Sequence, residues 1–271
     1  MTGSKTKPPP SGAPSVPPAA RPEATPTQLA REAMWAWLLV LALVAGLVHL
    51  NITLPAIGHL GSALIAVTFL YVPTWFAWRR GKDLVDYGFV TEPVRRGLAT
   101  AALVMLVLFP IFIAVYVGFY QAACKSSTLM HLAPRGLCAR YGGLAGIHWP
   151  VLHWGFGARN SFAEFCIVQL VVVALPEELF FRGYLLALLE KRWPPTRRIL
   201  GGGVGIALVL SATAFAIIHL PKDGDPRALA TFFPGLLFGW MRSTTGSILA
   251  STVTHASSNI LIRLLEASVL R

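Results

Sequence analysis

Two adjacent glutamates, Glu177 and Glu178, lie inside an otherwise apolar stretch between Val171 and Arg182. A carboxylate at membrane depth is costly unless it is paired or takes part in chemistry. Glu178 and Arg182 are four residues apart, so they share one face of a helix and can form an ion pair. Glu177 is turned about 100° away from Glu178 and has no partner on its own helix. We therefore expect Glu177 to act as a general base or acid, or, as the plainer alternative, to pair with a polar group of another helix.

Three further polar residues lie within apolar runs later in the chain. His219 is near the end of one run, whereas His255 and Asn259 are four residues apart in the last run and share a helix face. A lone histidine in an apolar helix is more often a hydrogen-bonded core residue than a catalyst. Together with Glu177, these side chains would supply a base, two imidazoles to orient water or stabilise charge, and an amide donor for an oxyanion. The sequence thus predicts one site built from three helices.

The composition indicates the environment in which such a site must form. Hydrophobic residues make up 55% of the 271 residues and charged residues only 13%, against about 25% charged residues in an average soluble domain. The net charge of +11 does not indicate nucleic-acid binding, because the basic residues cluster in short segments between apolar runs. The chain is therefore expected to be an integral membrane protein whose partner is the lipid bilayer.

Apolar runs recur along the chain, and about 20 residues are needed to cross the hydrocarbon core of a bilayer. We expect seven spans, of which the sixth is short: Trp35–Ile57, Leu60–Trp78, Leu98–Tyr120, Phe162–Leu189, Gly202–Leu220, Leu229–Met241 and Ile248–Leu265. The predicted fold is an all-α polytopic transmembrane bundle at residues 31–271. Residues 1–30 are rich in Pro and Ala without apolar periodicity, and they predict a disordered tail.

The distribution of Lys and Arg predicts the orientation. With a cytoplasmic amino terminus, fourteen of these residues fall inside and eight outside, which the positive-inside rule favours. The longest loop, Gln121–Asn160, then lies outside, where Cys124 and Cys138 are able to form a disulfide if their geometry permits it. If the site residues converge, the cavity should open toward the outer half of the bilayer, with residues 221–226 at its rim.

The three polar motifs occur in a recognisable order. They read EExxxR at Glu177–Arg182, FxxxH at Phe215–His219 and HxxxN at His255–Asn259. In this respect the chain resembles the CAAX protease and bacteriocin-processing (CPBP, or Abi) family of glutamic-type intramembrane endopeptidases. The resemblance covers residues 160–265, and it extends to the sorting peptidases of the myxosortase-like group.

The resemblance implies a role for each motif residue. Glu177 would activate the attacking water and His219 would help to position it, while His255 and Asn259 would stabilise the oxyanion. Glu178 and Arg182 would support the site, and no metal or other cofactor is implied. The implied substrate is a membrane-anchored protein or peptide, cut near a hydrophobic carboxyl-terminal segment, and the implied location is a bacterial inner membrane.

Two alternatives remain open at this stage. Two histidines and a carboxylate also make a three-ligand zinc site, although the sequence contains no HExxH motif. Intramembrane Glu and His residues also build proton relays in transporters, so a non-enzymatic transporter or adaptor is the rival class. The chain shows no inverted repeat, which is the usual indication of a secondary transporter.

Overall fold

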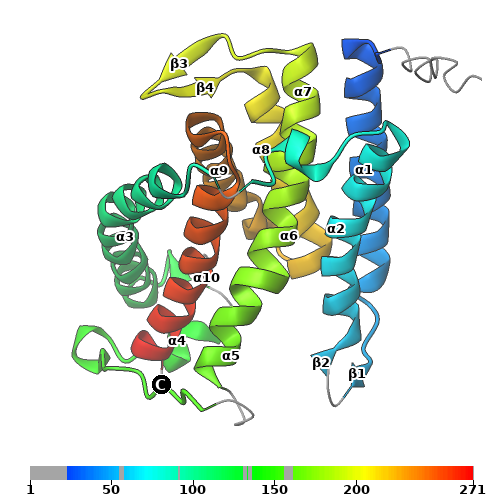
Figure 1. Ribbon diagram of the computed structural model, residues 1–271. Coiled ribbons are helices and arrows are strands. Elements are labelled where there is room, and N and C mark those ends of the chain that lie inside the picture. Colours follow the sequence, from blue (N-terminus) through cyan, green and yellow to red (C-terminus); the bar gives the residue numbers. More distant parts are fainter. Residues whose placement is uncertain are drawn as a thin grey trace, which may run out of the picture.

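The computed structural model describes residues 23–54, 58–90, 92–130, 133, 136–155 and 161–270. Helices dominate these residues, with two short two-stranded hairpins, so the predicted all-α bundle is confirmed (Figure 1). Residues 1–22 of the predicted disordered tail (1–30) lie outside the described residues. For residues 26–30 the prediction of disorder is wrong, because helix α1 begins at Pro26. Thr25 and Gln28 form a reciprocal capping box there, and Pro26 suits the first helical position.

The first two helices form an antiparallel pair. Helix α1 (Pro26–Leu47) and helix α2 (Leu60–Arg79) are joined by the short hairpin of β1 (Thr53–Leu54) and β2 (Gly58–His59). The first predicted span is thus displaced toward the amino terminus, whereas the second agrees closely. A 3-10 turn, η1 (Leu84–Tyr87), follows α2.

Helix α3 (Val94–Lys125) lies at the edge of the bundle and packs on helices α9 and α10 (Figure 1). Only 6% of its most apolar window is buried. Leucine, valine and isoleucine side chains are therefore exposed along its length, as expected for a helix that faces lipid. The short helix α4 (Leu137–Arg140) and the 3-10 turn η3 (Leu144–Gly146) follow in the long loop.

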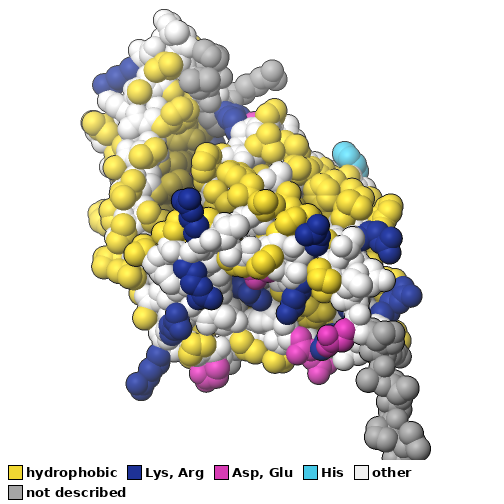
Figure 2. All heavy atoms as spheres, turned by 90° about the horizontal axis from the view of Figure 1, so that it is seen from above, with side chains coloured by type: hydrophobic (Ala, Val, Ile, Leu, Met, Phe, Trp, Pro, Cys, Tyr) yellow, Lys and Arg dark blue, Asp and Glu magenta, His cyan; other side chains and the backbone are white. Residues whose placement is uncertain are grey.

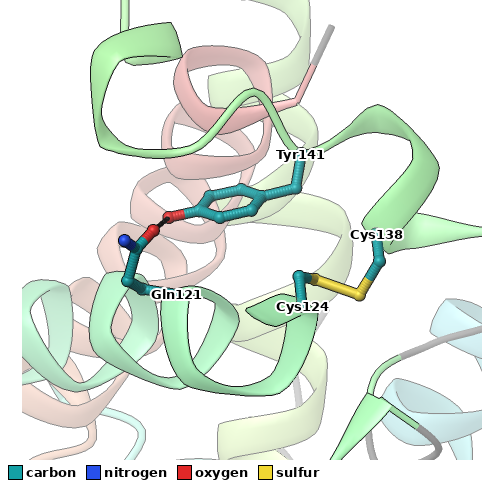
Figure 3. Close-up of a disulfide and its surroundings, with 4 residues drawn as sticks. All are labelled: Gln121, Cys124, Cys138 and Tyr141. Carbon is teal, nitrogen blue, oxygen red and sulfur yellow. Dashed lines mark hydrogen bonds between the residues drawn. A yellow bond between two sulfur atoms is a disulfide. The ribbon is translucent and has the colours of Figure 1, made fainter. Parts of the chain in front are cut away.

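A disulfide connects the end of α3 to α4. Cys124 and Cys138 are bonded, which settles the pairing that the sequence left open (Figure 3). Beside it, the Tyr141 hydroxyl donates a hydrogen bond to Oε1 of Gln121 at 2.7 Å. The long loop is therefore held against α3 at two points.

The central helical run is continuous from residue 162 to 192 but changes its winding. It consists of α5 (Phe162–Ile167), the π-helical η4 (Val168–Ala174), α6 (Leu175–Glu178), the π-helical η5 (Leu179–Leu185) and α7 (Leu186–Arg192). Pro176 removes a backbone donor between the two π-helical segments. π-helical turns occur frequently at functional sites, and here they flank the two glutamates.

The last part of the chain packs against this run. A hairpin of β3 (Arg197–Ile199) and β4 (Gly202–Val204) leads into α8 (Ile206–Asp223), and the 3-10 turn η6 (Pro226–Thr231) leads into α9 (Phe232–Thr245) and α10 (Leu249–Val269). Gly224, with a φ of 64°, ends α8 in the left-handed conformation. Helix α8 begins later than the predicted fifth span because β4 occupies residues 202–204.

The helices agree with an integral membrane protein. Among the described residues, α1, α2, α3 and α8 are each long and apolar enough to cross a bilayer. Helix α9 has 14 residues and extends about 21 Å, which is short of the roughly 30 Å hydrocarbon core. Helix α9 is therefore too short to cross the bilayer by itself, in agreement with the short sixth element expected from the sequence.

One end of the bundle is rich in basic side chains. Figure 2 shows Lys and Arg distributed over the face at which α1 begins. The basic residues of the elements that end or turn there are Arg79, Arg80, Lys191, Arg192, Arg197, Arg198 and Arg242. This distribution supports a cytoplasmic position for that face.

Candidate active site

The Glu178 carboxylate connects two helices. Its Oε1 lies 3.1 Å from Nη1 of Arg182, one turn along the same run, and accepts a hydrogen bond from Nδ1 of His255 at 3.0 Å. The exposed fractions of Glu178, Arg182 and His255 are 0%, 1% and 5%. The pair expected from the four-residue spacing therefore forms, and a histidine of α10 joins it.

Aromatic rings and a backbone carbonyl surround the buried Arg182 guanidinium. Its central carbon lies 4.0 Å from the Phe215 ring centroid and 5.3 Å from that of Phe238, so both rings add cation–π attraction. Its Nη2 donates to the carbonyl oxygen of Gly235 at 3.4 Å. A side chain at Gly235 would press on Ala212 and Phe215, so glycine permits this close approach of α9 to α8.

Glu177 pairs with a polar group of another helix, the plainer of the two alternatives left open by the sequence. Nζ of Lys222 donates to its Oε1 at 2.9 Å, across helices. The sequence analysis placed Lys222 in an outer loop, but it belongs to the last turn of α8. The other oxygen, Oε2, makes no hydrogen bond with the described residues and lies 3.9 Å from Nε2 of His255. Glu177 is therefore held at one oxygen and open at the other.

The two histidines approach the same aromatic ring. The Phe215 ring centroid lies 4.7 Å from that of His219 and 5.8 Å from that of His255, so the three rings form one cluster. Nδ1 of His219 donates to the Phe215 carbonyl oxygen at 2.8 Å, which leaves Nε2 for another partner. Phe238 stacks on His255 with an interplanar angle of 20°. Phe215, the first residue of the FxxxH motif, therefore packs beside both histidines of the site.

Asn259 contacts a residue that the sequence analysis did not select. Its Nδ2 donates to Oε1 of Gln169 at 2.8 Å. Helix α10 runs antiparallel to the central run, so His255 meets Glu177 and Glu178 while Asn259, one turn later, meets the earlier Gln169. One N–H of the Asn259 amide remains for a further acceptor.

Three residues of the site were not selected from the sequence. Lys222 follows His219 by three residues and so shares its helix face, which was a usable signal. Gln169 is a lone polar residue in the apolar run Phe165–Val173 and was equally visible. Phe238 could not be selected from the sequence, because a phenylalanine that stacks on a histidine has the same sequence pattern as one packed in the hydrophobic core.

The depth of the helices accounts for the convergence. Glu177 lies in the middle of the central run, and Lys222 in the last turn of α8 reaches it. Helix α8 therefore ends near the middle of that run.

The connection after α8 carries its own ion pair. Asp225 accepts hydrogen bonds from the backbone N–H of Arg227 at 2.9 Å and from its guanidinium. These bonds lower the pKa of Asp225 to about 2, so its carboxylate stays ionised at neutral pH. Arg227 and Asp225 therefore compensate each other.

The described part of the chain contains no group of three His, Cys, Asp or Glu side chains arranged to hold a metal ion. Nδ1 of each histidine is hydrogen-bonded, in His219 to a backbone carbonyl and in His255 to Glu178, which leaves both Nε2 atoms open. The ammonium group of Lys222 on Glu177 would repel a cation bound beside that carboxylate.

Comparison with known families adds an independent finding. Residues 159–261 match a family model described as Type II CAAX prenyl endopeptidase Rce1-like. Over this segment the chain is similar to the CAAX protease family. The segment contains all six motif residues that the sequence analysis selected: Glu177, Glu178, Arg182, His219, His255 and Asn259. No curated protein and no solved structure matches the chain. The CAAX protease family acts on membrane-associated proteins, which supports a hydrolase embedded in the bilayer.

Proposed function

We propose that this protein is a glutamic-type intramembrane endopeptidase. It hydrolyses a peptide bond near a membrane-associated, carboxyl-terminal segment of a protein substrate. The observation that carries this proposal is the Glu177 carboxylate, which is 3% exposed, has one oxygen without a hydrogen bond, and faces Nε2 of His255. A buried carboxylate with an open oxygen beside an imidazole is suited to activate water.

In the first step, Oε2 of Glu177 accepts a proton from a water molecule while the water oxygen attacks the scissile carbonyl carbon. His219 orients the water through its free Nε2. The carbonyl π electrons move to oxygen, and the resulting oxyanion accepts hydrogen bonds from the imidazolium form of His255 and from the Asn259 amide. Donors placed toward a developing oxyanion stabilise the transition state.

In the second step, protonated Glu177 transfers its proton to the leaving amide nitrogen. The carbon–nitrogen bond breaks, the oxyanion electrons re-form the carbonyl, and Glu177 returns to the carboxylate. Glu178 assists by accepting the Nδ1–H of His255, which fixes the orientation of the ring. Arg182 in turn neutralises Glu178 and holds it in place.

The position of the last turn of α8 supports an opening toward the outer half of the bilayer. Helix α8 enters from the basic face and meets Glu177 with its last turn, so the connection to α9 lies beyond the site on the opposite side. With the basic face cytoplasmic, the substrate segment would approach Glu177 from the outer half.

A reporter assay tests the function. A membrane-anchored reporter with a hydrophobic carboxyl-terminal tail is expressed with the wild type or with Glu177→Gln, which keeps the shape and removes the base. Processing should fall by at least about a hundredfold. Glu164→Gln is the matched control, because it makes the same change in the exposed first turn of α5 of the same run. Unchanged processing by a normally expressed Glu177→Gln protein would refute the proposal and favour a transporter or adaptor.

A further inference from the structure

Lys222 is the one cation in direct contact with Glu177 among the described residues, and none of the three motifs contains it. Its Nζ lies 2.9 Å from Oε1 of Glu177. The Lys222 side chain is 32% exposed, whereas the Glu177 side chain is 4% exposed. The contact therefore joins a buried carboxylate to the partly accessible end of α8.

The other charges of the site cannot replace this contact. Arg182 lies 3.1 Å from Glu178 and is enclosed by the Phe215 and Phe238 rings. Nδ1 of His255 is also directed to Glu178. Without Lys222, the buried cluster would hold two carboxylates and a single permanent positive charge, and an isolated buried carboxylate strongly favours its neutral form.

The geometry also selects which oxygen of Glu177 is used. Because Lys222 occupies Oε1, the carboxylate is turned so that Oε2 is the open oxygen, and this oxygen faces His255. The helix end fixes the position of the ammonium group, since Pro221 stiffens the last turn and Gly224 ends α8 directly afterwards.

We propose that Lys222 is a positioning residue of the peptidase reaction. It keeps Glu177 ionised and presents Oε2 to the water molecule. When the proton moves to Glu177, the negative charge passes to the oxyanion nearby, and the ammonium group continues to compensate it without leaving α8. This inference rests on the proposed function, because it assigns Lys222 a role in the same reaction.

The charged and titratable groups around Glu177 are few. Its own helical run contributes Glu178 and Arg182, α10 contributes His255, and α8 contributes His219, Lys222 and Asp223. Of these, Lys222 alone makes a direct hydrogen bond to Glu177. A change at Lys222 should therefore shift the pH at which activity is lost on acidification, because that loss reports the protonation of the base, Glu177.

The test compares Lys222→Met, Lys222→Gln and Lys222→Arg, purified in detergent, on one cleavable peptide over a range of pH. Both neutral variants should lose at least about tenfold in kcat at neutral pH, and their activity should begin to fall on the acid side at least about two pH units higher than in the wild type. Lys222→Arg keeps the charge, so it should retain most of the wild-type activity. Its activity should also begin to fall on acidification at the same pH as in the wild type. Arg227→Met, which removes a cation from the same connection, should leave the profile unchanged.

Two results would overturn the inference. One is a neutral variant with the wild-type pH profile, and the other is an equal proportional loss at every pH that Lys222→Arg does not rescue. If Lys222→Met does not fold, Lys222→Gln decides the question, because its amide can still donate to Glu177 without a charge. The two proposals fail separately: an active Glu177→Gln protein refutes the peptidase mechanism, whereas an inactive Glu177→Gln with a normal Lys222→Met refutes only the role of Lys222.

Discussion

His255 lies against Glu178, with Nδ1 3.0 Å from Oε1, although 77 residues separate the two positions. The same glutamate oxygen contacts Arg182. The second glutamate of the pair therefore holds together the central helical run and α10. Glu177, turned to the other side, is left to contact Lys222 and to face the opposite edge of the same imidazole.

Replacing Glu178 should harm both stability and activity. Glu178→Ala leaves the fully buried Arg182 without its carboxylate, and breaking a buried pair in this way costs about 3–5 kcal/mol. Thermal unfolding in detergent measures the loss. The control is Glu190→Ala, whose pair with Arg242 is partly exposed and should cost no more than about 1 kcal/mol. Equal effects of the two changes would contradict the structural role of Glu178.

The Asn259 amide should contribute mainly to kcat. Asn259→Ala removes a donor directed to the oxyanion, and losses of about 10²–10³ in kcat are typical when one such donor is removed. Gln169→Leu removes the acceptor that orients the amide and should cause a smaller loss of kcat. Steady-state kinetics on a peptide substrate separate kcat from KM. A loss confined to KM in both variants would instead indicate a role in substrate binding.

Metal chelators should leave the peptidase active. The proposed mechanism activates water with the Glu177 carboxylate, and the Lys222 ammonium group on that carboxylate would repel a metal cation. Activity of the purified protein is measured after dialysis against a chelator and after addition of zinc. Loss of activity that zinc restores would favour the zinc-dependent alternative.

The disulfide between Cys124 and Cys138 should stabilise the loop without taking part in catalysis. It closes a sequence separation of 14 residues, for which the chain-entropy estimate is about 3 kcal/mol. Cys138→Ser should lower thermal stability while specific activity of the folded fraction stays close to that of the wild type. Cys166→Ser, at the only free cysteine among the described residues, is the control and should change neither. A catalytic defect in Cys138→Ser with unchanged stability would contradict this assignment.

The apolar character of the helices, the Glu178–Arg182 pair and the three-motif pattern were readable from the sequence. Each depends on spacing along one helix or on the length of an apolar run, and both properties are local. Seven spans were expected, whereas four of the described helices are long and apolar enough to cross a bilayer. The helix ends were predicted less accurately than the helices themselves. The start of α1 depended on a capping box at Thr25 and Gln28, and the start of α8 on a short hairpin.

The tertiary structure alone decided which side chains meet across helices. Lys222 was assigned to a loop because periodicity along α8 does not reveal how deep its last turn lies, and so the partner of Glu177 on another helix could not be named. Gln169 with Asn259 and Phe238 with His255 likewise depend on how α9 and α10 cross the central run. The residue types of the site are a property of the sequence, whereas the partner of each carboxylate is set by helix packing, because contacts between separate helices have no fixed spacing along the chain.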